Sequence, residues 1–174
     1  MKKRILLITA CLVLAFALCL GFLYFNHDIG ISRARMEERV RETYGSDRGW
    51  AVEGSVSDKM AAYISYAPDQ SAHSFSVYVN RPGLSFGYFF RGGGRLDGVN
   101  GGILEYTVEN CMERAFISLN TQQASRLEFD DGTDIQVMEL DSGKPFALVL
   151  PVNLASVTFY DADGNVVPYE SRKL

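Results

Sequence analysis

The first strong pattern along the chain is an uninterrupted apolar run close to its N-terminus. Residues 5–25 contain no charged side chain, and the next charge is carried by Asp28. A helix over this 21-residue run rises about 30 Å, which matches the hydrocarbon thickness of a bilayer. The pattern predicts a membrane-spanning helix over residues 5–25, preceded by a short start at residues 1–4.

Positive charge precedes this run. Lys2, Lys3 and Arg4 lie directly before it, and no acidic residue occurs there. The positive-inside rule therefore predicts an N-terminus in the cytoplasm and a C-terminal domain outside it, anchored in the cell membrane by a single pass.

Processing of the apolar run has three alternative forms. Cleavage after Ala17 fits a small-residue signal-peptidase site, but it would leave a strongly apolar new N-terminus. Lipidation would use Cys11, which comes early, or Cys19, which follows the bulky Leu18. A pilin-type leader needs its glycine before the run, whereas Gly21 lies inside it. These patterns favour an uncleaved anchor.

Beyond the anchor, the pattern is that of a mostly polar helix over residues 28–44. Asp28 is placed to cap its start and Gly45 to end it. Its apolar stripe is narrow and rests mainly on Met36 and Val40, which is typical of a helix that stays in solvent. We expect residues 26–45 to form a polar helical stalk, with a helix docked on the following domain as the alternative.

From Trp50 onward the apolar positions recur every second residue. Such stretches are separated by turn-forming pairs, among them Pro82-Gly83 and Asp131-Gly132, and the latter suits a type I′ hairpin turn. Short strands at this spacing, with no helical pattern between them, indicate an antiparallel β-sandwich. Residues 46–174 are therefore predicted to form one mainly β domain, Ig-like or similar.

The stretch "NRPGLSFGYFFRGGGR", residues 80–95, combines four aromatic side chains with three successive glycines. Leaving an aromatic side chain in water forgoes roughly 1.5–3 kcal/mol, so the ring-rich part is expected to be a core strand. Alternation then places Leu84, Phe86, Tyr88 and Phe90 inward and Phe89 outward.

Residues 91–102 that follow are predicted to form a glycine-rich loop. Within it, Arg91 and Arg95 flank Gly92, Gly93 and Gly94, so two guanidinium groups and several backbone amides are available to hold an anionic group. Phe89 would add an exposed ring beside this loop. The alternative is a flexible hairpin loop without a ligand.

A weaker metal signal lies near the C-terminus. Asp161, Asp163 and Asn165 begin like a calcium-binding loop. The pattern then fails, because Val166 stands where glycine is needed and Arg172 where glutamate is needed. We expect a turn here and no metal.

Other catalytic chemistry has little support in the sequence. The two histidines, His27 and His73, have no partners at zinc-ligand spacing, and Cys111 is the one cysteine outside the apolar run. A buried, unreactive thiol is the expectation for Cys111. No cofactor is predicted.

Charge narrows the choice of partners. Of 17 Lys and Arg residues, three precede the apolar run, which leaves 14 against 21 acidic residues and a net charge of −7. Nucleic-acid binders need a basic surface to neutralise phosphates, so a nucleic-acid partner is not expected.

Four segments, "NRPGLSFGYFFRGGG", "RAFISLN", "KPFALVLP" and "VTFYDADGNVV", resemble a group of small, membrane-anchored extracytoplasmic proteins of Gram-positive bacteria. The likeness covers residues 50 to about 169 and implies the same location and a one-domain β architecture. No activity is known for that group.

Together these patterns predict a membrane-tethered binding domain for a cell-envelope component, such as an envelope polymer, or for a membrane protein. Two alternatives are a hydrolase acting on a cell-wall polymer and a structural subunit of a membrane complex. A pocket holding two carboxylates, or Cys111 beside His73, would favour the hydrolase.

Overall fold

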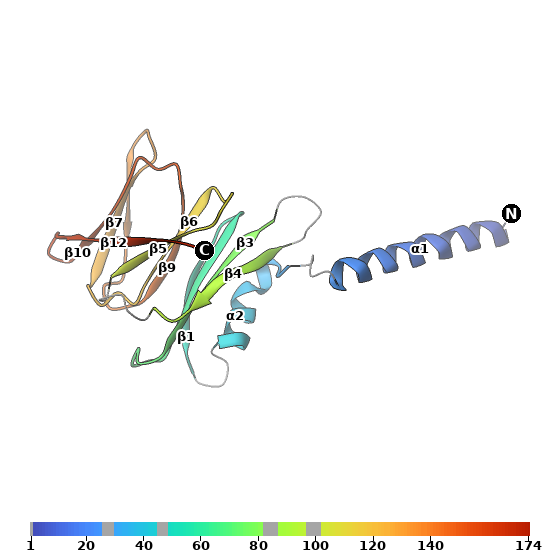
Figure 1. Ribbon diagram of the computed structural model, residues 1–174, viewed down its shortest axis with the longest axis horizontal. Helices are drawn as coiled ribbons and strands as arrows, with labels where there is room; N and C mark the ends of the chain where they lie inside the picture. Colours follow the sequence, from blue (N-terminus) through green and yellow to red (C-terminus); the bar gives the residue numbers. More distant parts are fainter. Residues whose placement is uncertain (1, 26–29, 45–48, 82–86, 97–101) are drawn as a thin grey trace.

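The computed structural model describes residues 2–25, 30–44, 49–81, 87–96 and 102–174. A long helix and a short helical segment precede a body of strands (Figure 1). The elements in chain order are α1 (Lys2–Phe25), the 3₁₀ helix η1 (Arg33–Arg35), α2 (Met36–Tyr44), β1 (Ala51–Val56), β2 (Met60–Tyr66), β3 (His73–Asn80), β4 (Tyr88–Gly94), β5 (Ile103–Thr107), β6 (Glu113–Ser118), β7 (Ala124–Asp130), β8 (Ile135–Glu139), β9 (Phe146–Pro151), β10 (Ser156–Asp161), β11 (Val166–Val167) and β12 (Tyr169–Lys173).

The strands form three sheets of four strands each. Sheet I has the order β1-β2-β3-β4, sheet II the order β12-β5-β6-β9, and sheet III the order β11-β10-β7-β8. All neighbouring strands are antiparallel except β12 and β5, which run parallel. The mainly β class predicted from the sequence is confirmed.

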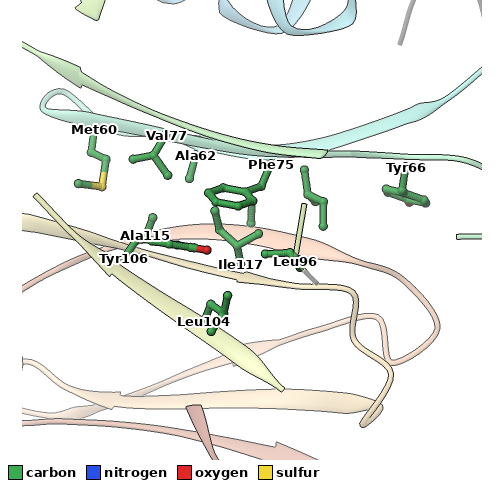
Figure 2. Close-up of a cluster of buried hydrophobic side chains, with 12 residues drawn as sticks. Met60, Ala62, Tyr66, Phe75, Val77, Leu96, Leu104, Tyr106, Ala115 and Ile117 are labelled. Carbon is green, nitrogen blue, oxygen red and sulfur yellow. The ribbon is translucent and has the colours of Figure 1, made fainter. Parts of the chain in front are cut away.

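Sheet II lies between the other two sheets, and its strands β5, β6 and β9 contribute side chains to a core cluster on each face. On one face, Leu104 and Ile117 belong to a core cluster shared with sheet I, and the Phe75 and Tyr106 rings stack across it at 4.7 Å. Figure 2 shows the side chains of this cluster pointing toward one another from the two sheets. On the other face, Phe116 packs against Phe159 of sheet III at 5.3 Å. The strands therefore stack in three layers, where the sequence suggested the two of a sandwich.

A buried ion pair lies among the apolar side chains of sheet II. The Arg114 guanidinium lies 2.6 Å from the Glu105 carboxylate, and both side chains are largely buried. The Ser171 hydroxyl on β12 also donates a hydrogen bond to this carboxylate. This second partner links the C-terminal strand to β5 by side chains as well as backbone.

Within the described residues 30–44, helix α2 packs on the outer face of sheet I, as in the docked-helix alternative, and does not extend as a stalk. Met36 and Val40 are buried to 0% and 1% exposure. They lie in a cluster with the strand residues Ala61, Tyr63, Tyr78 and Tyr88. A two-residue stripe suffices for docking because the sheet supplies most of the apolar surface in the contact. Both faces of β2 are consequently covered, and all seven of its residues are buried.

The segment before α2 is joined to the edge of sheet I by a β-bridge. The Ile31 amide donates to the Tyr88 carbonyl at 2.9 Å, and the Tyr88 amide donates to the Ile31 carbonyl at 2.8 Å. Glycine is required on both sides of this contact. A Cβ at Gly87, which has φ +92°, would lie 2.4 Å from the Ile31 carbonyl oxygen, and a Cβ at Gly30 would lie 2.8 Å from the Tyr88 carbonyl oxygen.

Helix α1 is long and apolar enough to cross a membrane, and no side chain in its most apolar window is buried against the rest of the protein. In Figure 1 it extends away from the side of the body where α2, β3 and β4 lie, whereas β7 and β10 lie on the opposite side. Six residue steps separate Phe25 from Ile31, so a fully extended chain would span at most about 20 Å between them.

The packing of α2 generates a stability prediction. Met36→Ala removes a fully buried side chain and should lower the free energy of unfolding by about 2–5 kcal/mol. Thr43→Ala on the exposed side of the same helix should change it by less than about 0.5 kcal/mol. Chemical denaturation of the full chain in detergent micelles measures both, and equal, negligible effects would mean that α2 does not dock.

Candidate functional site

The first four residues of the stretch predicted as a loop, 91–94, form the C-terminal part of edge strand β4. Gly92, Gly93 and Gly94 pair with residues of β3, and the register shifts by one residue between Val77 and Tyr78. Arg91 is therefore the extra residue of a β-bulge. The predicted loop at residues 91–94 is thus wrong, and residues 97–101 of the same stretch lie outside the described residues.

Neighbouring atoms lie so close to the backbone of this strand that they explain the presence of glycine in it. A Cβ at Gly93 would lie 2.5 Å from the Phe75 carbonyl oxygen, which leaves no room for a side chain. At Gly92 the nearest atoms belong to the flexible Leu174 side chain. Glycine at position 93 is thus explained by packing within the strand. The sequence analysis had attributed it to a flexible loop.

The two arginines proposed as an anion clamp occupy different positions relative to strand β4. Arg91 lies in the bulge, and Arg95 follows the end of the strand, four residues away. Arg91 and Arg95 are both exposed, but only Arg91 lines the groove described below.

The aromatic side chains of β4 differ from the predicted alternation. Tyr88 is buried as expected, but Phe90 is 52% exposed and contacts Tyr78 edge-on. Phe89, expected to be the exposed ring, is half-buried beneath the Arg81 guanidinium, which lies 4.5 Å from the ring centre. Leu84 and Phe86 lie outside the described residues.

An open groove of about 560 Å³ lies where one end of sheet I meets the turn between β5 and β6. This volume falls within the range of small-ligand sites. Three parts of sheet I line it, namely residues 58–59 before β2, residues 79–81 at the end of β3, and Arg91 on β4. Residues 109–112 of the β5–β6 turn form the opposite wall.

The groove combines apolar and charged surface. Val79, Cys111 and Met112 contribute apolar side chains, and the first two pack against the core cluster between sheets I and II. Lys59, Arg81 and Arg91 bring three positive charges to it. Such a mixture fits a ligand with an apolar part and an anionic group.

A hydrogen-bond network holds the turn that carries Lys59. The Ser57 hydroxyl donates to the Glu113 carboxylate on β6 and accepts from the backbone amides of Lys59 and Met60 at 3.1 and 3.0 Å. The Tyr88 phenol on β4 donates to the Ser57 carbonyl. The turn is thereby tied to β4 and to sheet II, so the position of Lys59 follows from the packing of the two sheets.

The two carboxylates of the groove are engaged by basic side chains. Asp58 lies 2.9 Å from the Arg33 guanidinium, which also donates to the Val56 carbonyl at 2.8 Å, and Glu109 lies 3.8 Å from the Lys173 ammonium. The side chains of Asp58 and Glu109 are 93% and 73% exposed. A general acid needs a desolvated carboxyl group, so this pair is poorly suited to glycoside hydrolysis.

Cys111 brings a thiol to the groove. Burial raises the pKa of its thiol, an effect to which the Glu113 carboxylate adds, while a backbone hydrogen bond from Glu113 and the Lys59 ammonium oppose it. A raised pKa disfavours the reactive thiolate at neutral pH. Cys111 is half-buried and contributes to the shape of the groove.

The Cys–His pair that would favour a hydrolase does not form. His73 begins β3, whereas Val79 and Asn80, which share the groove with Cys111, lie at the end of that strand. The imidazole Nε2 of His73 accepts a hydrogen bond from the Leu96 amide at 3.0 Å. Its position at the start of β3 separates it from the thiol by about the length of the strand, roughly 20 Å.

The segment considered for calcium forms the turn between β10 and β11. The Asp161 carboxylate accepts hydrogen bonds from the backbone amides of Asp163 and Asn165 at 2.9 and 2.8 Å. Hydrogen bonds from the Asn165 side chain and backbone lower the pKa of Asp161. Within the described ranges, no group of three or more His, Cys, Asp or Glu residues is arranged to hold a metal ion.

Sequence reasoning missed most of the groove, including Lys59, Arg81 and the wall at residues 109–112. These residues come from separate segments and have no shared spacing in the sequence. Cys111 was considered as a buried thiol or as a partner of His73, because its actual neighbours become apparent only when the sheets are stacked.

Comparison of the chain with protein-family models, with curated proteins and with solved structures gives no match.

The environment of Cys111 predicts its reactivity. In a background with Cys11→Ser and Cys19→Ser, alkylation by iodoacetamide should follow a pH profile displaced upward from that of a free cysteine. Lys59→Ala should displace the profile further upward, because it removes a charge that favours the thiolate. A profile at or below that of the free amino acid would contradict the assigned burial.

Proposed function

We propose that this protein is a membrane-anchored binding domain whose groove recognises an anionic group on a partner at the outer membrane surface. The partner is a membrane protein or a cell-envelope component close to the bilayer. The observation that carries the proposal is the placement of Lys59, Arg81 and Arg91 around one groove beside the anchored end of sheet I.

Topology follows from charge and length. Helix α1 has the length and apolarity of a membrane span, and Lys2, Lys3 and Arg4 precede its apolar part. The positive-inside rule then favours a cytoplasmic N-terminus and an extracytoplasmic domain. The resemblance to anchored extracytoplasmic proteins of Gram-positive bacteria agrees with this arrangement but stays a prediction.

The linkage between anchor and domain limits the reach of the groove. The Ile31–Tyr88 bridge and the Arg33–Asp58 ion pair join the chain leaving the membrane to the strands beside the groove. Because α2 is docked, it adds nothing to the length of the tether. A tether of at most about 20 Å suits a partner at the membrane surface better than a remote layer of the envelope.

Local charge supports an anionic ligand in spite of the negative net charge of the domain. The two acidic side chains of the groove have basic partners in Arg33 and Lys173. Arginine guanidinium groups recognise carboxylates and phosphates through paired hydrogen bonds, and lysine adds a point charge. The groove therefore presents a local excess of donors and positive charge.

A matched pair of arginine variants tests the proposal. A photo-crosslinking amino acid at Met112, which is 57% exposed and lines the groove, captures the partner of the full-length protein in cells. Arg91→Ala should lower the recovery of the crosslinked complex by about tenfold or more, the loss expected for one charge-assisted hydrogen bond. Arg95→Ala, an exposed arginine that does not line the groove, should leave it unchanged.

The thermal unfolding midpoints of both variants should match that of the parent, because each side chain is exposed. Equal recovery of the complex with Arg91→Ala and with Arg95→Ala would refute a role for the groove.

A further inference from the structure

Strand β8 is one of the two outer strands of sheet III, and all five of its residues are exposed. Three of them are large and apolar: Ile135 is 68% exposed, Val137 is 55% exposed and Met138 is 36% exposed. Its backbone pairs with β7 alone, and neither of its faces is buried in the core between sheets II and III. A strand of this composition leaves apolar surface and backbone groups without cover on the same edge.

The register identifies the uncovered backbone groups. The Leu140 amide donates to the Ser125 carbonyl at 2.8 Å, and the Asp131 amide donates to the Asp134 carbonyl at 3.3 Å. Hydrogen-bonded pairs alternate along an antiparallel ladder, so residues 136 and 138 exchange hydrogen bonds with β7. The amides and carbonyls of residues 135, 137 and 139 therefore point away from the sheet.

Two of the other outer strands carry features that hinder pairing with a further chain. Strand β4 has a bulge at Arg91 and already holds Ile31, and β11 has only two residues. Regular pairing runs without a shift along β8, which contains no proline and no lysine. These are the features of an edge that accepts another strand.

Charge indicates what kind of strand fits. Residues 124–140 contain one basic residue, Arg126, and five acidic residues: Glu128, Asp130, Asp131, Asp134 and Glu139. In the loop between β7 and β8, the Asp131 carboxylate accepts hydrogen bonds from the Thr133 hydroxyl and from the Asp134 and Thr133 amides. These hydrogen bonds lower the pKa of Asp131 to about 2, so this carboxylate stays charged. The acidic groups would repel a second copy of β8 and attract a strand that carries Lys or Arg.

We propose that β8 accepts an extended, lysine- or arginine-bearing segment of a partner protein as an additional antiparallel strand of sheet III. Backbone groups of residues 135, 137 and 139 supply the hydrogen bonds. Ile135 and Val137 pack against the apolar side chains or the methylene stems of the added strand, while Asp134 and Glu139 pair with its cations. This site is separate from the groove and does not depend on the function proposed for it.

Two short peptides test the proposal on the full-length protein in nanodiscs of neutral phosphatidylcholine. The first is a fluorescein-labelled octapeptide that alternates lysine and valine, and the second has glutamate in place of lysine. A shift of one residue in the pairing exchanges the two faces of a strand. Because lysine and valine alternate along the peptide, either register places all lysines on one face and all valines on the other. Fluorescence anisotropy, with empty nanodiscs subtracted, should show at least about tenfold tighter binding of the lysine peptide.

Hydrogen exchange locates the contact. The amides of Ile135, Val137 and Glu139 should exchange rapidly in the free protein and at least about tenfold more slowly with the lysine peptide bound. Val137→Pro removes one outward amide without touching the ladder to β7 and should weaken the peptide by about tenfold or more. Val137→Thr keeps this amide and should retain binding.

If Val137→Pro fails to fold, Ile135→Lys with Val137→Lys replaces it, since two added cations should likewise abolish binding of the lysine peptide. The proposal is overturned by equal binding of the two peptides, by no binding of the lysine peptide up to about 1 mM, or by binding without protection of the three amides. Protection of these amides in the free protein, together with a doubled mass, would show self-pairing and also overturn it.

Discussion

The structure depends on the burial of sheet II between two other sheets. Without a disulfide in its strand region, the domain is held together by two apolar layers that meet on opposite faces of β5, β6 and β9. The Phe75–Tyr106 stack on one side and the Phe116–Phe159 contact on the other fix the order of the layers. The groove forms at the end of the first layer, where sheet I and the β5–β6 turn of sheet II meet.

A second consequence of this stacking is that the two surfaces proposed for binding lie at different ends of the molecule. The groove adjoins the segment that leaves α1, because Ile31 and Arg33 contact Tyr88 and Asp58. Strand β8 belongs to sheet III, on the far side of sheet II. Since packed sheets are about 10 Å apart, the strands of sheet I that line the groove lie about 20 Å from sheet III across the stack.

Periodicity in the sequence was sufficient to identify strands but not their number of layers. The alternation from Trp50 onward predicted antiparallel strands, and these are present. It did not show that β2 is covered on both faces, because small residues such as Ala61 and Ala62 are apolar without standing out in a pattern. The hairpin at Asp131-Gly132 was likewise recognised, but its loop spans residues 131–134, and Gly132 alone in it has a positive φ, so it is not a type I′ turn.

The errors have physical causes in particular residues. Glycine at position 93 satisfies a close contact with the Phe75 carbonyl, and from sequence alone this cannot be told apart from the glycine of a loop. The narrow stripe of Met36 and Val40 indicated a stalk, because the partner surface of Tyr63, Tyr78 and Tyr88 is distant in the sequence. The groove was invisible for the same reason, since its basic residues come from three separate segments.

The central claim is that stacking and the docked α2 hold the groove close to the membrane. Energy transfer to acceptor-labelled lipid headgroups tests it, with a donor on Lys59→Cys in the groove or on Thr133→Cys in the β7–β8 loop, each in a background in which the native cysteines are replaced by serine. The account predicts clearly stronger transfer from position 59 than from position 133. Weak and equal transfer from both positions, as expected for a domain on a 20-residue helical stalk about 30 Å long, would contradict it.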